Sequence, residues 1–170
     1  MIEDCWLVQQ MSRLIPMTDA DDAAPARLSG MPSWLLGQAS VQAHRLLSDG
    51  LAAVDSRGYD YRLLAALDEF GPASQASLGR RARIDRSDVV ACLNDLAAAG
   101  LVERSPDPAD GRRNIVTITP KGAAHLARLD VVLDRVQDDL LAPLSPLERQ
   151  LLVDLLARVL THQARGPGGL

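Results

Sequence analysis

Residues 110–119 read Asp-Gly-Arg-Arg-Asn-Ile-Val-Thr-Ile-Thr, and this stretch is typical of the second arm of a β-hairpin. The residues Pro-Asp-Pro-Ala-Asp-Gly at 106–111 favour a turn, whereas Leu-Val at 101–102 and Ile-Val-Thr-Ile at 115–118 are apolar or β-branched. Residues 101–104 and 114–118 are therefore predicted to pair as antiparallel strands around this loop. An acid and an arginine then lie two residues apart at the hairpin tip.

The residues before the hairpin predict two short helices joined by a tight turn. Ser74 is a good N-cap for a helix over 75–82, and Asp85 is a good N-cap for a helix over 86–99. About three residues separate them, which matches a helix-turn-helix whose second helix enters the major groove of DNA. The second helix has apolar residues at helical spacing, namely Val89, Cys92, Leu93 and Leu96.

Longer helical patterns flank this central segment. Ser33 is expected to cap a helix over 34–54, whose apolar residues cover more than one face and so predict burial against both its own domain and a second subunit. A further helix is expected over 59–70. Pro120 begins a predicted helix over 120–141. Ser-Pro-Leu-Glu at 145–148 is a capping box that begins the last helix.

The two ends of the chain carry weaker patterns. Residues 4–15 have apolar residues at helical spacing, and 18–32 are acidic and rich in Ala, Pro and Gly, so 1–32 are expected to form a helix followed by a flexible linker. If this segment is an upstream extension, translation is expected to start at Met17 or Met31 instead. Residues 164–170 are expected to form a frayed tail.

These motifs together resemble the MarR family of bacterial transcription regulators over about residues 34–163. The resemblance rests on Asp110-x-Arg112-x5-Ile118-Thr119, on Leu96-x3-Gly100-Leu101-Val102-Glu103-Arg104, and on Pro-Leu-Ser-Pro-Leu-Glu-Arg before the last helix. It implies a mainly α fold with a small β-hairpin wing, in which a winged helix-turn-helix lobe (59–119) sits on a helical dimerisation region (33–58 and 120–163). It also implies a homodimer that binds a pseudo-palindromic operator with half-sites about 34 Å apart.

The wing offers specific contacts to such an operator. Arg112 at the tip can reach into the minor groove, where narrow A·T tracts concentrate negative potential. Asp110 is expected to hold the tip by accepting hydrogen bonds from Arg112 or nearby backbone. Arg113 would reach a phosphate or lie along the strand. The alternative is a solvent-exposed turn with ordinary surface arginines.

The predicted recognition helix carries little positive charge, whereas MarR-like chains commonly place basic residues about where Ala91 and Asp95 fall here. Asp88 either accepts a hydrogen bond from cytosine or favours the positive end of the helix dipole. The residues this helix offers to a groove are Arg86, Ser87, Asp88, Val90, Ala91 and Asn94. Non-specific affinity is therefore expected to be modest and to rest on Arg80, Arg81, Arg83, Arg112 and Arg113.

Composition agrees with this interpretation. The chain has 170 residues, of which only 3% are aromatic, so its core must come from Leu, Ala and Val, a composition that suits helices. The net charge is −4, but residues 71–122 hold eight Arg and Lys against six Asp and Glu. This segment, which contains the DNA-binding pattern, is thus the positive part of an acidic chain.

Many members of this family bind small aromatic molecules between the DNA-binding lobe and the dimer helices, and release DNA in response. The resemblance implies such a ligand here. The alternative is that the tryptophan and tyrosines only fill the core and that the histidine is solvated. The candidates by position are Trp34, Gln38, His44, Arg45, Tyr59 and Tyr61.

Other classes of function find little support. There is no phosphate-binding glycine loop and no nucleophile elbow, and the three histidines are widely separated, so no enzyme, metal site or cofactor is expected. Cys92 is expected to be a core residue. Cys5 leaves a redox-sensing regulator as an alternative, although the peroxide-sensing branch of the family carries its cysteine in the first core helix.

Location and partner class follow from the same patterns. No run of about 18 apolar residues and no signal pattern occur, so a cytoplasmic protein without membrane contact, associated with the nucleoid when bound to DNA, is expected. A winged-helix dimer that acts only through protein–protein contacts is the remaining alternative.

Overall fold

The computed structural model describes residues 24–107 and 110–164, without the side chains of 110–113 and 164. It is mainly α with one small antiparallel sheet, which confirms the predicted fold class. In chain order the elements are α2 (Ala26–Ser29), α3 (Pro32–Ala52), α4 (Gly58–Phe70), β1 (Ala73–Ser74), α5 (Gln75–Ala82), α6 (Arg86–Ala98), β2 (Val102–Asp107), β3 (Asp110–Ile118), α7 (Pro120–Leu140) and α8 (Pro146–Ala164).

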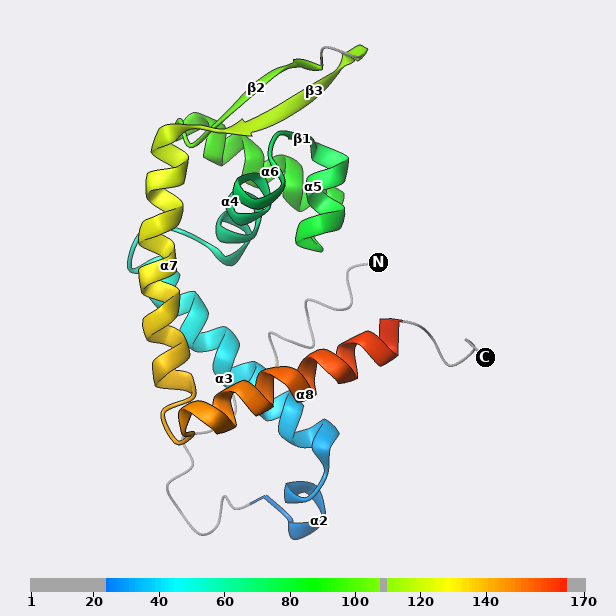
Figure 1. Ribbon diagram of the computed structural model, residues 1–170, viewed down its shortest axis with the longest axis vertical. Helices are drawn as coiled ribbons and strands as arrows, with labels where there is room; N and C mark the ends of the chain where they lie inside the picture. The colour runs from blue at the N-terminus through cyan, green and yellow to red at the C-terminus, as the bar shows by residue number, and fades with distance from the viewer. Residues whose placement is uncertain (1–23, 108–109, 165–170) are drawn as a thin grey trace.

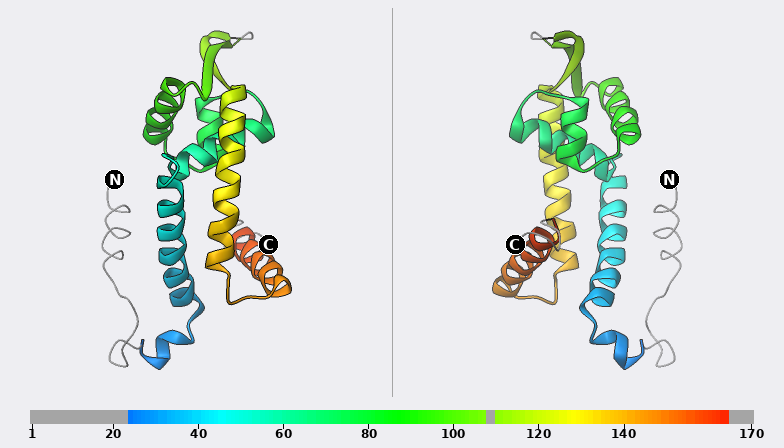
Figure 2. Two further views of the ribbon diagram at one scale, coloured as in Figure 1. Left: turned by 90° about the vertical axis from the view of Figure 1, so that its left-hand side faces the viewer. Right: turned by 90° about the vertical axis from the view of Figure 1, so that its right-hand side faces the viewer.

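The molecule has a lobe at one end and long helices at the other (Figure 1). The lobe contains α4, α5, α6 and the sheet. From the end of β3, α7 runs out of the lobe, packing first on α4 and then alongside α3, as both views of Figure 2 show. α7 is therefore the element that joins the lobe to the remaining helices.

The core lies within the lobe and is built from leucine and valine. It is contributed by α4, α5, α6, β3 and α7, and burying each such side chain stabilises the fold by about 1.5–3 kcal/mol. The apolar face predicted for the second helix of the helix-turn-helix is buried in full. The largest fully buried side chains are Leu63, Leu64, Leu67, Leu78, Val89, Leu93, Val116 and Leu129.

The sheet is larger than the sequence predicted. It has three strands in the order β1-β3-β2, and the hairpin strands extend to Asp107 and Asp110, beyond the predicted limits of 104 and 114. Pro106 does not end β2 because β2 pairs on one side only, and proline is tolerated on an edge strand. β1 was missed because a two-residue strand, in which Ala73 pairs with Val116, has no periodic signal.

Two predictions about the N-terminal part were wrong. Ser33 is not the N-cap of α3, because the helix begins one residue earlier at Pro32, and Met31 occupies the cap position without a side-chain hydrogen bond. Proline is favoured in the first turn, where its missing N–H is not needed, and this preference prevails over the serine. The predicted linker contains the short helix α2. The predicted helix over 4–15 and Cys5 lie outside the described residues.

Other predicted helix ends are confirmed. Ser74 Oγ accepts a hydrogen bond from the Ser77 N–H at 3.3 Å, whereas Asp85 occupies the N-cap of α6 without a side-chain hydrogen bond. At α8 the capping box is present: Glu148 Oε2 accepts from the Ser145 hydroxyl at 2.7 Å and from the Ser145 N–H at 2.8 Å. These hydrogen bonds from Ser145 hold the pKa of Glu148 below its usual value.

The start of α7 is fastened to the turn between α6 and β2. The Thr119 hydroxyl caps α7 by accepting from the Gly122 N–H at 3.0 Å, and Lys121 Nζ donates to the Ala99 carbonyl at 2.7 Å. Gly122 lies so close to the strand that a Cβ built on it would stand 2.0 Å from the Leu101 carbonyl oxygen. Glycine is therefore required by close approach at this position.

Apolar side chains are exposed on α3 and especially on α8, which packs little against the rest of its own chain (Figure 1). Leu147 is 84% exposed. Exposed apolar side chains in such number on one element are typical of an interaction site. None of the described helices combines the length and the apolar character needed to cross a membrane. The exposed residues are Leu35, Leu36, Leu147, Leu151, Val153, Leu155, Val159 and Leu160.

Candidate nucleic-acid interface

The turn between α5 and α6 is held by a contact from α4. Arg83 adopts the left-handed conformation, with φ +52° and ψ +54°, and so ends α5 sharply. Its carbonyl accepts a hydrogen bond from the Arg62 guanidinium at 2.8 Å. Ile84 in the turn is buried. The two helices are thereby set at a fixed angle, which is what a helix-turn-helix needs to present its second helix.

α6 buries one face and presents the other to solvent. Its buried side is apolar apart from the Cys92 thiol. All six residues that the sequence predicted to face a groove are exposed along α6. Arg86 is their only cation. These residues are Arg86, Ser87, Asp88, Val90, Ala91 and Asn94.

The arginines around the turn differ in their surroundings. Arg80, Arg81 and Arg83 are all exposed. The Arg81 guanidinium lies 4.5 Å from the centre of the Phe70 ring, a cation–π contact that holds this side chain over α4. Arg80 faces the same surface hollow as Arg86. Arg80 and Arg83 are thus more available to a phosphate than Arg81.

The hairpin of β2 and β3 projects from the lobe beyond α6 (Figure 1). The predicted wing residues Asp110, Arg112 and Arg113 belong to β3. Their side chains lie outside the described part of the structure, so their contacts stay a prediction. Asp107 pairs with Asp110 near the tip, after an irregularity in the register at Pro106.

A hollow of about 650 Å³ lies between α5, the first half of α6 and the middle of β3. Arg80 and Arg86 line it together with one acid, Asp85, and two amide side chains, Gln75 and Asn114. The sequence analysis did not single out either amide. Asn114 could have been noticed as the polar first residue of the predicted strand over 114–118, whose other residues are apolar or β-branched.

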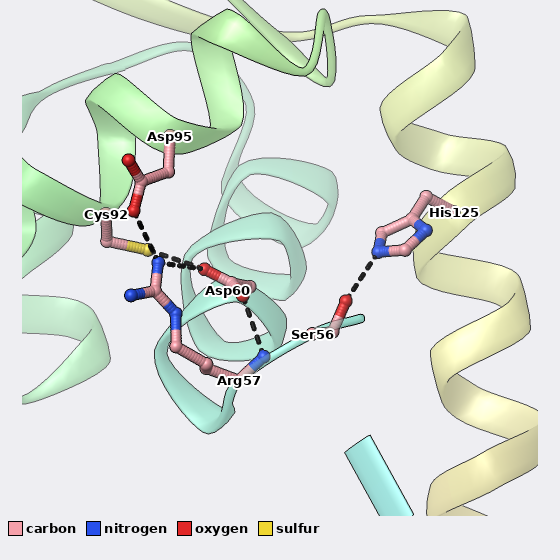
Figure 3. A network of polar contacts seen from close by, with 6 residues as sticks. All are labelled: Ser56, Arg57, Asp60, Cys92, Asp95 and His125. Carbon is pink, nitrogen blue, oxygen red and sulfur yellow. Dashed lines mark hydrogen bonds and ion pairs between the residues drawn. The ribbon is translucent and has the colours of Figure 1, made fainter. Parts of the chain in front are cut away.

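A buried carboxylate ties α4 to α6 (Figure 3). Asp60 is 7% exposed, and its carboxylate accepts from the Arg57 N–H at 2.7 Å and from the Cys92 thiol at 3.0 Å. Burial, followed by the contact with Asp60, raises the pKa of Cys92 well above its ordinary value. The thiol therefore stays protonated and serves as a hydrogen-bond donor.

Asp95 on the same helix has a partner that the sequence analysis missed. Its carboxylate accepts from the Arg57 guanidinium at 2.7 Å, and the guanidinium also lies 3.5 Å from Asp60 (Figure 3). The hydrogen bond with Asp95 is the main cause of the raised pKa of Arg57. The carboxylate of Asp95, at a position where the resemblance led us to expect a base, is thus partly neutralised within the chain, which reduces its repulsion of a nearby anion.

A second polar contact joins the same loop to α7. Arg128 can only donate, so its 2.9 Å contact makes His125 Nδ1 an acceptor, and Nε2 then carries the hydrogen. Nε2 donates to Ser56 Oγ at 2.8 Å (Figure 3). Burial, followed by the charge of Arg128, lowers the pKa of His125. The imidazole is thus neutral in the folded protein at pH 7.

Acidification should therefore destabilise the fold through His125. Because its pKa is lower in the folded than in the unfolded chain, the stability it contributes is present above about pH 6.5 and is lost as the pH falls through the folded pKa. Urea unfolding at about pH 7.5 and 5.5 should show a smaller loss of stability in His125→Gln than in the original chain. Equal losses in the two proteins would contradict this assignment.

The predicted ligand residues fall into two groups. Trp34, Gln38, His44 and Arg45 lie on α3, whereas Tyr59 and Tyr61 lie on α4. From Trp34 to the end of α3 the helix extends roughly 27 Å, so one chain does not bring Trp34 to the tyrosines. Burial, followed by the carboxylate of Asp130 on α7, raises the pKa of Tyr61. Within the described ranges no group of three metal-ligating side chains occurs.

Comparisons with known proteins place this geometry among regulators. Residues 50–113 match the model described as the MarR family. A putative transcriptional regulatory protein for the hcr operon of Thauera aromatica is 33% identical over 110 residues, which are 65% of this chain and 66% of that protein. Across the first three curated relatives, the matched segment spans between 59% and 66% of their length.

Two solved structures are similar over most of the chain. The PcaV transcriptional regulator of Streptomyces coelicolor, in complex with its natural ligand, is 31% identical with a TM-score of 0.68, covering 82% of this chain and 98% of that one. BpsR of Bordetella bronchiseptica, described in terms of the regulation of its DNA binding by 6-hydroxynicotinic acid, is 26% identical with a TM-score of 0.70. That match covers 80% of this chain and 97% of BpsR.

Proposed function

The chain belongs to the MarR family of transcriptional regulators, and from that membership we propose that it binds a pseudo-palindromic DNA operator as a homodimer. The observation that carries the proposal is the exposed polar face of α6 beside a projecting hairpin. In this arrangement α6 enters the major groove and the hairpin enters the neighbouring minor groove. Residues 59–119 form the DNA-binding lobe.

The dimerisation region of the proposal comprises residues 33–58 and 120–163. Its support is the exposed apolar surface of α3 and α8, which a second copy of the chain would cover. Two lobes related by a two-fold axis would then meet two half-sites one helical turn apart. The chain should accordingly sediment as a dimer at micromolar concentration.

A small aromatic ligand is proposed to regulate DNA binding. The support comes from PcaV, solved with its natural ligand, and from BpsR, whose DNA binding responds to 6-hydroxynicotinic acid. The proposed site lies between the lobe and the dimer helices. Because Trp34 and the tyrosines are far apart in one chain, a site that uses both groups would take them from different protomers.

DNA binding is tested by gel retardation with fragments from the promoter region of the chain's own gene. We expect retardation that weakens as salt rises, since phosphate contacts release counterions. If no fragment is retarded even at low salt, the regulator proposal fails, and a dimer that acts through protein contacts becomes the better interpretation.

Removing Arg112 should weaken binding across operator sequences. The proposed minor-groove contact is largely electrostatic, so Arg112→Ala should also reduce the slope of log K against log salt concentration by about one. Arg135→Ala is the matched control, because it removes the same charge from an exposed position on α7. Unchanged binding by Arg112→Ala at several salt concentrations would exclude the minor-groove role.

Changes on α6 should have a different signature. Arg86→Ala or Ser87→Ala should alter which operator bases matter, because base-edge contacts in the major groove discriminate between sequences. Each lost contact should reduce discrimination by about 1–3 kcal/mol at one base position. Binding to a set of single-base operator variants measures this. A uniform loss on every variant would place these residues at phosphates instead.

A further inference from the structure

The function described so far gives no role to the amide side chains that line the hollow between α5, α6 and the middle of β3. Its cations, Arg80 and Arg86, come from α5 and α6, and its amides, Gln75 and Asn114, come from α5 and β3. Gln75 is half-buried and Asn114 is exposed. Within the described part of the chain, neither side-chain amide is hydrogen-bonded to another residue. Both amides are thus available to a ligand.

The position of the hollow indicates which ligand this is. In a duplex, a major groove and the adjacent minor groove are separated by one sugar–phosphate strand. If α6 occupies the major groove and the hairpin tip occupies the minor groove, that strand must cross the surface between them. In this chain the hollow lies on that surface, because residues of α6 and Asn114 of β3 both line it.

We propose that the hollow seats the sugar–phosphate strand between the two grooves, with the amides of Gln75 and Asn114 donating hydrogen bonds to phosphate oxygens. This inference rests on the DNA-binding function proposed above. The charges agree with it, because Arg80 and Arg86 outnumber the one lining acid, Asp85. Amide side chains are common phosphate ligands, and such contacts fix the position of a protein on DNA without reading its sequence.

A neutral donor to phosphate leaves a distinctive signature in binding experiments. It adds affinity without adding a charge, so it changes the binding constant but not the salt dependence. It also acts equally on every sequence. These two properties distinguish the amides from Arg112, which changes the salt slope, and from base contacts on α6, which change sequence preference.

The first test measures binding to a random-sequence duplex of about 30 base pairs, long enough for two half-sites one helical turn apart. Fluorescence anisotropy at several low salt concentrations gives both Kd and its salt slope. The double variant Gln75→Ala with Asn114→Ala should bind about three- to tenfold more weakly than the original chain, with the same slope. Thermal melting of each variant confirms that it is folded.

The second test changes the charge of the hollow. Asn114→Arg should bind more tightly, with a salt slope steeper by about one, and Asn114→Asp should bind more weakly. The same changes at Gln137, which is exposed near the far end of α7, are the matched controls. Sedimentation verifies that these control variants keep the oligomeric state of the original chain, and their DNA binding should then change little. If the Asn114 variants behave like the Gln137 variants, or if the double alanine variant binds like the original chain, the proposed contact between the hollow and the sugar–phosphate strand is refuted. If the original chain binds no DNA, the proposed function itself is wrong.

Discussion

Replacing Gly122 with alanine should lower the free energy of unfolding by about 3 kcal/mol. The added Cβ would lie 2.0 Å from the Leu101 carbonyl oxygen and 2.9 Å from Ile118 Cγ1. A backbone oxygen cannot rotate away as a flexible side chain can, so α7 and β2 would have to separate. Separation would also strain the Thr119 cap and the Lys121 contact, which fasten the same junction.

Urea unfolding followed by circular dichroism measures this effect, with Gly37→Ala as the matched control. Gly37 is also a helical glycine, but an added Cβ there meets nothing within 4 Å. That change should stabilise the chain by about 0.5–1 kcal/mol, because alanine loses less conformational freedom than glycine in a helix. Similar stability changes in the two variants would show that the close approach of Gly122 is unimportant.

Asp60→Ala should lower the free energy of unfolding by about 2–3 kcal/mol. The change removes the acceptor for the Arg57 N–H at the start of α4 and leaves the buried Cys92 thiol without its partner. A buried donor that loses its acceptor keeps the full desolvation penalty. The loss should therefore exceed that of an ordinary helix cap, which is about 1 kcal/mol.

Asp95→Ala is the control, because it removes the other carboxylate that contacts Arg57. The side chains of Asp95 and Arg57 are each 63% exposed, so their ion pair should stabilise the fold by less than about 1 kcal/mol. Chemical denaturation at pH 7 compares the two variants. An effect of Asp95→Ala as large as that of Asp60→Ala would mean that the exposed ion pair, rather than the buried carboxylate, holds α4 to α6.

The parts of the fold that the sequence predicted well are those with strong local signals. Ser74 and Asp85 mark the starts of α5 and α6 because N-caps precede apolar residues at helical spacing. The start of α3 was misplaced because two local signals, Pro32 and Ser33, compete there. β1 could not be found, because its two residues form a strand only by pairing with β3.

The site was less predictable because its contacts join distant parts of the chain. Asp60 and Cys92 are 32 residues apart, and the Cys92 position carries only the apolar pattern of a core residue. Asp95 looked like a departure from the family pattern until the structure supplied Arg57 as its partner. Gln75 and Asn114 become neighbours of one hollow only after the lobe folds.

The exposed apolar surface of α8 has a consequence for what can be called the stability of this protein. α8 has 19 residues and packs little on its own chain, whereas most helical stability in proteins comes from packing of an apolar face. In the dimer that we propose, association supplies the missing packing, so ordering of α8 and assembly are thermodynamically one event. Stability is then set by protomer concentration as well as by sequence. The cellular concentration of the protein would thus also set the fraction of copies that is folded as a dimer and competent to act.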